Sequence, residues 1–236
     1  MEHKHKFIRI IVDKTDRERK NTNLSMFENS PDAILLDCGC NDGQLTLEVA
    51  QKISTGNIFG IDCLTENIIA SGKRGIKSFQ HDLNNKLPFA DESFDVIHAG
   101  DIIEHLFDTD TFIKEIYRIT KAGGYVVIST NNLASLHNII YLLFGRQPAP
   151  AAVSDKVVVG GWRKTSAILL PGAGHQRLFT LGALTGLCEY HGFHVEKTRG
   201  SGFYPFPVVL ARILAVISKN HSSYIAIKAR KEDRKE

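Results

Sequence analysis

The stretch AILLDCGCNDGQLTLEVAQKI, residues 33–53, passes from an apolar run through a glycine-containing turn into a helical pattern. The run AILLDCG is short and uninterrupted, as expected of a strand that is buried on both faces. Leu45, Val49 and Ile53 then recur at helical spacing. A strand that leads through such a turn into a helix is the first unit of a parallel sheet covered by helices.

The same alternation continues to about residue 130. Further apolar runs bounded by turn residues predict strands at 57–63, 75–82, 93–100 and 125–130. Thr65 is a residue type favoured at N-caps, so a helix is expected to begin there. A second helix is expected within 108–124, ended by Gly123 and Gly124.

The pattern is less regular after residue 132. Residues 133–145 look helical, whereas 145–175 are rich in Gly, Pro, Ala and Ser. A long segment with so little pattern is often a functional lid. The rest of the chain predicts three further elements: a helix from Thr180, a strand at 193–200 and a last strand at 222–230. The strongly apolar segment 206–219 precedes the last strand.

The chain is expected to form one domain. Its 236 residues are 43% hydrophobic and 23% charged, which is ordinary globular usage and enough for a sizeable core. The predicted parts are an N-terminal helical segment (1–32), a cofactor-binding core (33–132), a lid or insert (133–175), and the C-terminal part of the sheet (176–230).

Bulk properties predict a soluble cytoplasmic protein. The net charge of +3 is mild and does not by itself imply a nucleic-acid partner. Four cysteines do not form the dense pattern of a secreted disulfide scaffold. The first 20 residues are charged and lack the apolar core of a signal peptide, and no apolar run approaches the roughly 20 residues that span a bilayer.

Acidic residues follow three successive predicted strands: Asp37, Asp62 and Asp82. In open α/β sheets a ligand binds outside the carboxyl ends of the strands. A carboxylate at Asp62 can accept two hydrogen bonds from a ribose diol, and one at Asp82 can accept from an exocyclic amine. This edge suits a cationic adenosine ligand better than an anionic dinucleotide.

The turn after the first strand argues against two kinds of phosphate-binding site, a dinucleotide-binding loop and a P-loop. Its spacing, Gly39-x-x-x-Gly43, differs from the G-x-G-x-x-G of dinucleotide-binding proteins. Asn41 stands where a middle glycine is expected, although Asn tolerates positive φ better than most residues. No Gly-Lys-Ser/Thr follows, which excludes a P-loop here.

Five segments, in order, resemble the motifs of class I S-adenosylmethionine-dependent methyltransferases: LLDCGCNDG, FGIDC, HDLNNKLPFADESFDVIHAGDIIEHL, ITKAGGYVVIST and GHQRLFTLGALTGLCEYHGFHVE. They most resemble the small-molecule branch related to the ubiquinone and menaquinone methyltransferases. The resemblance covers roughly residues 33–200. It implies a Rossmann-like, doubly wound α/β fold, with a seven-stranded, mostly parallel sheet, an antiparallel last strand, and helices on both faces.

The resemblance also implies the cofactor, S-adenosylmethionine, whose product is S-adenosylhomocysteine, and a set of binding residues. Gly39, Cys40, Asn41 and Gly43 would line the methionine part, with Asp37 near its amino group. Asp62 would hold the ribose, and Cys63 would lie beside the adenine, whose edge Asp82 and the Leu83 N–H would bind. Ala99, Gly100 and Asp101 would close the site near the methyl group.

Methyl transfer by in-line displacement needs a base only if the acceptor must lose a proton. His105 and Asp101 are the candidate catalytic residues, and His175 is a further candidate base. His175, Arg177 and Asn131 are expected to contact the acceptor. Glu104 and His105 in IIEHL also suggest a catalytic Glu–His pair. The simpler alternatives are that Glu104 and His105 only pack or cap the next helix, and that His175 and Arg177 only fix a helix terminus.

There are three alternatives to a small-molecule methyltransferase site. A zinc site at Cys38, Cys40 and Cys63 is not expected, because the spacing is not C-x-x-C and no fourth ligand is evident. A nucleic-acid methyltransferase is disfavoured because HAGDIIEH, residues 98–105, lacks the Asn/Asp-Pro-Pro-aromatic motif. A non-catalytic cofactor-binding module is the third alternative.

The apolar residues 203–219 have two interpretations. They predict a buried helix of the core or of a subunit contact, or else a segment for peripheral membrane contact. The sequence identifies neither the acceptor, which is a small molecule such as a lipid, quinone or sugar, nor the oligomeric state.

Overall fold

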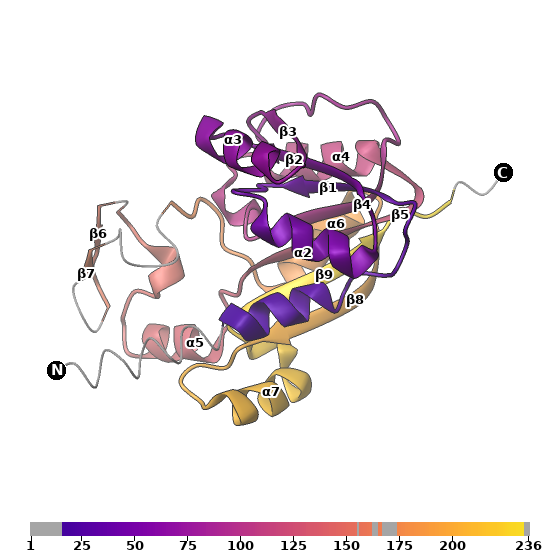
Figure 1. The fold of residues 1–236 in the computed structure, drawn as a ribbon. Coiled ribbons are helices and arrows are strands. Elements are labelled where there is room, and N and C mark those ends of the chain that lie inside the picture. Colours follow the sequence, from indigo (N-terminus) through magenta and orange to yellow (C-terminus); the bar gives the residue numbers. More distant parts are fainter. Residues whose placement is uncertain (1–15, 155, 162–164, 167–173, 234–236) are drawn as a thin grey trace.

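A computed structural model describes residues 16–154, 156–161, 165, 166 and 174–233 of the chain. Seven strands form one sheet in the order β3-β2-β1-β4-β5-β9-β8 (Figure 1). Their bounds are Ile34–Cys38 (β1), Asn57–Asp62 (β2), Lys77–Gln80 (β3), Phe94–Gly100 (β4), Thr120–Asn131 (β5), His194–Ser201 (β8) and Tyr224–Arg230 (β9). Strands β1 to β5 pair in parallel, and β9 runs antiparallel to both β5 and β8. The predicted sheet is confirmed.

Helices follow most of the strands. They are α2 (Gln44–Ile53), α3 (Thr65–Lys73), α4 (Thr109–Ile119), α5 (Leu136–Leu143), α6 (Leu181–Tyr190) and α7 (Val208–Ile217). A further helix covers residues 16–24. Within the segment predicted as a lid, β6 (Val157–Val158) pairs with β7 (Thr165–Ser166), and 155, 162–164 and 167–173 lie outside the described residues.

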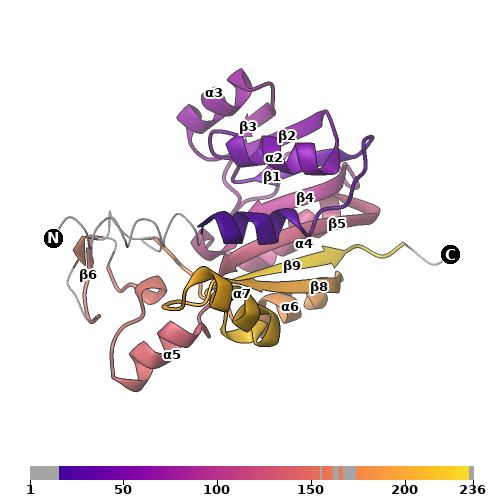
Figure 2. The ribbon, with the colours of Figure 1, turned by 60° about the horizontal axis from the view of Figure 1, so that its bottom comes forward.

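The sheet is covered on both faces, which explains why its central strands are uninterrupted apolar runs. Leu35 and Leu36 are adjacent in β1, and both are fully buried, but in different core clusters. Leu36 packs with residues of α4 and α6. Leu35 packs with residues of α2 and with Met26 and Phe27. Figures 1 and 2 show α2 and the helix of residues 16–24 side by side.

Strand order reverses between β1 and β4, where ligands bind in sheets of this type. Asp37 on β1 lies opposite Gly60 of β2 and His98 of β4. The carboxyl ends of the three strands therefore meet at one edge. The predicted acidic strand ends Asp37 and Asp62 lie at this edge.

One predicted helix end and one predicted N-cap are wrong. Gly123 and Gly124 do not stop a helix, because α4 ends at Ile119 and β5 begins at Thr120. The register between β4 and β5 shifts at this point, and a Cβ on Gly124 would lie 2.9 Å from the Asp95 carbonyl. The glycines thus allow a close approach of strands. The helix α3 begins at Thr65 as predicted, but Thr65 is not its N-cap, since Leu64 occupies that position and has no side-chain cap.

The helix α7 is not part of the main core, which corrects one interpretation of residues 203–219. Only Ala211 and Ala215 of this helix are buried, and they pack against Phe203 in a small separate cluster. Among the described residues, no helix is both long enough and apolar enough to span a membrane.

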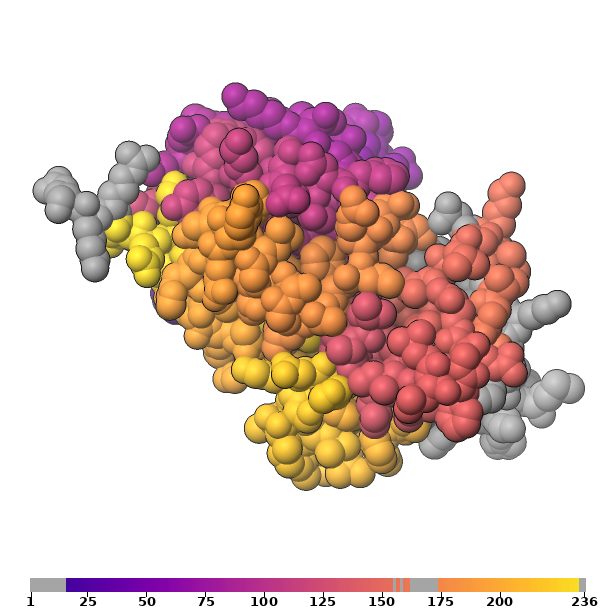
Figure 3. All heavy atoms as spheres, turned by 180° about the vertical axis from the view of Figure 1, so that it is seen from behind, coloured from indigo at the N-terminus to yellow at the C-terminus, as the bar shows by residue number. Residues whose placement is uncertain are grey.

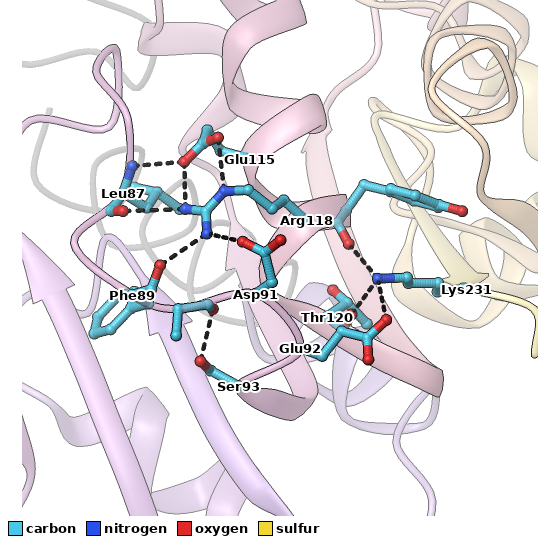
Figure 4. A network of polar contacts seen from close by, with 11 residues as sticks. Leu87, Phe89, Asp91, Glu92, Ser93, Glu115, Arg118, Thr120 and Lys231 are labelled. Carbon is cyan, nitrogen blue, oxygen red and sulfur yellow. Dashed lines mark hydrogen bonds and ion pairs between the residues drawn. The ribbon is translucent and has the colours of Figure 1, made fainter.

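A polar network braces the end of the sheet opposite the acidic edge (Figure 4). Arg118 on α4 donates to the Glu115 carboxylate on the same helix and to the carbonyls of Leu87 and Phe89. Its guanidinium also pairs with Asp91 at 2.8 Å. The loop that leads into β4 is thereby fixed to α4.

Candidate active site

A cavity of about 760 Å³ opens at the reversal of strand order. It is bounded by the loop after β1, the ends of β2 and β4, and the helix of residues 16–24. Eight of the predicted site residues line it: Asp37, Gly39, Cys40, Asn41, Asp62, Gly100, Asp101 and His105. Five predicted cofactor residues do not: Gly43, Cys63, Asp82, Leu83 and Ala99.

The loop after β1 turns through three residues with positive φ. Gly39, Asn41 and Gly43 have φ values of 77°, 49° and 83°. Asn41 thus adopts the left-handed conformation that a glycine adopts readily. Gly43 serves packing, since a Cβ there would lie 2.5 Å from Ile76 Cδ1. The loop keeps its turn without the usual middle glycine.

Asp62 joins this loop to the next unit of the fold. Its Oδ2 accepts from the Asn41 N–H, and its Oδ1 accepts from the Leu64 N–H and the Asn67 side-chain amide, each at 3.0 Å. A carboxylate has about four lone-pair positions, so one acceptor position is left for a ligand. Asp62 is nearly buried, which fixes the direction of that position.

Asp37 begins a buried chain of hydrogen bonds that crosses the sheet. Its carboxylate accepts from the Thr46 hydroxyl and, at 2.8 Å, from His98 Nδ1. The Asn23 amide donates to His98 Nε2 at 3.0 Å and to the Ser129 hydroxyl at 3.2 Å. The tautomer of His98 that donates through Nδ1 and accepts at Nε2 satisfies both of its contacts. The edge of the sheet at Asp37 is in this way linked to the helix of residues 16–24.

A second contact holds the same helix over the site. Arg19 forms an ion pair with Oδ2 of Asp101, whose φ of 52° is unusual for a residue other than glycine. The other oxygen, Oδ1, is buried and has no hydrogen-bond partner. Burial raises the pKa of Asp101, and the charge of Arg19 opposes this rise. A buried carboxylate oxygen without a partner is unfavourable, so Asp101 gains from any cation or hydrogen-bond donor that reaches it.

Glu104 lies next to Asp101 in the interior. Only 2% of it is exposed, and its Oε2 has no hydrogen-bond partner. Burial, and then the charge of Asp101, raise the pKa of Glu104 to about 7. Asn131, a predicted acceptor residue, donates to its Oε1 at 3.4 Å. A carboxyl group poised near neutrality is suited to take up a proton.

The segment after the predicted lid returns to Glu104. The Gln176 and Arg177 N–H groups donate to the Glu104 carbonyl at 2.7 and 3.1 Å. His175 is thereby placed against His105, with ring centroids 4.9 Å apart. Burial, and then the charge of His105, lower the pKa of His175. The predicted residues His105, His175, Arg177 and Asn131 gather around Glu104, which the sequence indicated only as the partner of His105.

Glu104, His105 and His175 also have the composition of a metal site. Each offers one ligand atom, and these atoms lie within 4.8 Å of one another. His105 Nδ1 faces the Gly174 carbonyl and His175 Nδ1 faces the Pro150 carbonyl, each at 3.3 Å, so the Nε2 lone pairs are left available. This arrangement suits a proton acceptor as well as a divalent ion.

The cysteines form no such group within the described part of the chain. Cys38, Cys40 and Cys63 are free thiols, of which the first two are buried. Burial raises the pKa of Cys40 to about 12, so its thiol is neutral.

Asp82 lies in an exposed turn. Its Oδ1 accepts from the Asn84 N–H and side-chain amide at 2.9 Å, which is the Asx-turn of an ordinary loop. The role of Asp82 and Leu83 at the adenine edge stays a prediction.

Sequence reasoning missed the residues that the helix of residues 16–24 contributes: Arg19, Lys20 and Asn23. One signal was available. His98 lies in the middle of an apolar strand, and a buried histidine requires partners. Asp37 and Asn23 are those partners.

Comparisons with known proteins agree with this geometry. A family model described as "Methyltransferase domain" matches residues 36–128. The chain is 29% identical over 183 residues to the human mitochondrial ubiquinone biosynthesis O-methyltransferase, which covers 73% of this chain and 44% of that protein. It is 28% identical over 172 residues to the demethylmenaquinone methyltransferase of Bacillus velezensis, which covers 67% and 73% respectively. The chain spans less than half the length of several curated relatives that it matches.

Solved structures show the same fold. An S-adenosylmethionine-dependent methyltransferase from Mesorhizobium loti superposes with a TM-score of 0.60 at 18% identity, over 88% of this chain and 95% of that chain. A 4+2 cyclase superposes with a TM-score of 0.58 at 20% identity, over 91% and 80%. The predicted class I S-adenosylmethionine-dependent methyltransferase fold, with relatives among the quinone methyltransferases, is confirmed.

Proposed function

We propose that this chain, which has the class I methyltransferase fold, transfers a methyl group from S-adenosylmethionine to a small-molecule acceptor. The observation that carries the proposal is the meeting of three carboxylates, Asp37, Asp62 and Asp101, in one cavity beside a left-handed turn. The cavity has the size of a small-molecule site. Acidic residues outnumber Lys and Arg in its lining, which fits a cationic ligand.

Each end of the cavity is assigned to one part of the cofactor. Gly39, Cys40, Asn41 and Asp37 would hold the methionine end, and the free acceptor position of Asp62 would hold the ribose. Cys63, Asp82 and Leu83 would bind the adenine. The pairing of β2 with β3 supports this adenine assignment, because it places Asp62 opposite Gln80, shortly before Asp82.

The chemistry needs mainly alignment. S-adenosylmethionine supplies a methyl group that already carries its leaving group. The chain would orient the acceptor behind it, and such positioning supplies roughly 7–11 kcal/mol. Asp101, Ala99 and Gly100 would close the site near the methyl group. For an acceptor that must lose a proton, we propose that His105 and Glu104 take it.

The acceptor class is a finer proposal. Two relatives bear names from ubiquinone and menaquinone synthesis, which favours a quinone-type molecule over a sugar. His175, Arg177 and Asn131 would contact the acceptor, with residues 133–175 as a lid. We further propose a cytoplasmic location, supported by four unpaired cysteines, and peripheral membrane contact through residues 203–219.

Calorimetry with S-adenosylhomocysteine tests the proposal. Replacing Asp62 by Ala should remove a charge-assisted hydrogen bond of roughly 1.5–3 kcal/mol, which is about a 10–150-fold loss of affinity. Glu66, an exposed carboxylate on the following helix, provides the control, and Glu66→Ala should leave the affinity within about 2-fold. No binding of either cofactor form by the unaltered chain would refute the proposal.

A turnover assay distinguishes two roles for Glu104 and His105, that of proton acceptors and that of metal ligands. Dialysis against EDTA should leave methyl transfer unchanged if Glu104 and His105 act as bases. A loss restored by Mg²⁺ or Zn²⁺ would instead assign Glu104, His105 and His175 to a metal. Cofactor binding without turnover of any quinone, lipid or sugar acceptor would favour the non-catalytic alternative.

A further inference from the structure

The outer face of α7 is apolar and exposed to solvent. Val209, Ile213, Val216 and Ile217 are 73%, 52%, 84% and 76% exposed. They recur at helical spacing on the side opposite the buried Ala211 and Ala215. Four large aliphatic side chains on one exposed helix face are more than the scattered apolar residues of an ordinary surface.

The end of α5 adds a second set. Leu142, Leu143 and Phe144 are 56%, 78% and 66% exposed. The two helices are neighbours, because Leu136 of α5 packs in the same small cluster as Ala211 and Ala215. Figures 1 and 3 show both helices at the same end of the molecule. These exposed faces of α5 and α7 are here called the apolar end.

The segments that form the apolar end carry basic residues and no acidic ones, although Arg212 pairs with Glu18 of the N-terminal helix. Residues 133–154 and 197–231 contain no Asp or Glu. Arg212 lies on α7 between Val209 and Val216, and Lys219 follows the helix; both are exposed. Arg146, also exposed, follows α5. An apolar helix face bordered only by cations from its own segment is the composition of helices that lie in the interface of an anionic membrane.

We propose that the apolar end docks onto a membrane surface that contains anionic lipids. A second copy of the chain fits less well, because joining two such faces would bring the basic residues that border them, among them Lys219, against like charges with no carboxylate from these segments between them. A lipid surface with anionic headgroups satisfies both the apolar side chains and the cations.

The apolar end is connected to the cofactor cavity. Arg212 forms an ion pair with Glu18, and the next residue, Arg19, pairs with Asp101 inside the cavity. Docking would therefore hold the cavity next to the lipid, where an apolar acceptor resides. The inference deepens the membrane contact proposed for residues 203–219 and rests on the proposed function only for this acceptor route.

Vesicle flotation of the full chain tests the inference. We expect binding to phosphatidylcholine vesicles that contain phosphatidylglycerol, weaker binding to phosphatidylcholine alone, and further weakening in high salt. The double variant I213D/V216D should bind the anionic vesicles roughly 10-fold more weakly or worse. I69D, which places the same charge at an exposed apolar position on α3, should bind as the unaltered chain does.

Two measurements keep the outcomes distinct. Calorimetry with S-adenosylhomocysteine should give the same affinity for I213D/V216D as for the unaltered chain, which shows that the variant is folded and leaves the proposed function untouched. Equal vesicle binding by I213D/V216D and I69D, or no binding by the unaltered chain, would overturn the inference. So would a dimer, seen by light scattering, that I213D/V216D converts to a monomer without vesicle binding.

Discussion

At the scale of single residues, Glu104 shows how the fold changes the chemistry of a side chain. The carboxyl group is buried beside Asp101, which raises its pKa to about 7 from 4.5. Burial penalises the charged form, and a second negative charge adds to the penalty. The folded chain therefore binds a proton at Glu104 that the unfolded chain has already released at neutral pH.

This predicts a pH-dependent loss of stability that Glu104→Gln removes. Below pH 4.5 both states are protonated, so the group costs nothing. Between pH 4.5 and 7 the unfolded state loses its proton first, and stability falls by an amount on the order of 3 kcal/mol, after which the cost is constant. Urea unfolding of the unaltered chain and of E104Q should differ by more at pH 8 than at pH 5, in favour of the variant.

The exposed Glu66 provides the control for this prediction. Glu66→Gln removes a carboxylate that lies in solvent on α3, so its effect on unfolding should be small and equal at the two pH values. If E104Q and the unaltered chain differed by the same amount at pH 5 and pH 8, the raised pKa of Glu104 would be wrong.

The sequence predicts the positions of residues that are fixed by the local backbone. Asn41 and Asp62 could be predicted because they follow strand ends, and strand ends of a parallel sheet meet at one edge. Glu104 and His98 are different, since their roles depend on burial and on partners far along the chain. The Asp37–His98 contact joins residues 61 positions apart, and no local pattern records it.

At the scale of elements, predicted boundaries are wrong where long-range contacts override the local preference of the sequence. Gly123 and Gly124 resemble a helix end, yet they lie in β5, at the register shift between its two stretches that pair with β4. Backbone hydrogen bonds with Lys231, which follows β9, hold them there. The helix of residues 16–24 was expected as a helical segment, but its position over the cavity was not. That position depends on contacts such as Arg19–Asp101, between residues 82 positions apart.

The network around Arg118 yields a prediction for the element α4. Arg118→Ala would leave the buried Glu115 carboxylate without its main cation and the Leu87 and Phe89 carbonyls without this donor. Removing one partner of a largely buried ion pair costs about 3–5 kcal/mol, and the partial exposure of Arg118 favours the lower limit. Urea unfolding measures this loss of stability.

The same variant should bind S-adenosylhomocysteine normally, because the network braces the loop that enters β4 rather than the edge where β4 ends. Lys114→Ala is the matched control, since it removes an exposed cation from the same helix. An R118A chain as stable as K114A would show that solvent replaces the network at little cost.

At the scale of the whole molecule, topology could be predicted because each strand and helix repeats one local pattern in a known order. The exposure of α7 could not be predicted from the sequence, since a helix that is apolar on most sides is normally expected to be buried. Ala211 and Ala215 provide only a narrow packing face, and the larger side chains Val209, Ile213 and Val216 point outward. A surface of this kind is a property of the assembled fold.

The assembled fold also predicts how a ligand stabilises it. A ligand that binds only the folded chain adds about 2.7 kcal/mol of stability at 100 times its Kd. The helix of residues 16–24 lines the cavity, and Asn23 and Arg19 hold it to His98 and Asp101. Local opening of this helix would dismantle one wall of the site, so bound ligand must oppose that opening.

We therefore expect S-adenosylhomocysteine to slow amide hydrogen exchange in residues 16–24 as well as in the loop of residues 39–43, which lie close to each other only in the folded chain. Asn23→Ala should weaken the effect in the helix more than in the loop, because it breaks the hydrogen bond to His98 while Asp62 still holds the Asn41 N–H. The exposed α7, which lies outside the lining of the cavity, serves as the internal reference. Protection confined to residues 39–43 would mean that the helix opens independently of the ligand, and that the cofactor site is complete without it.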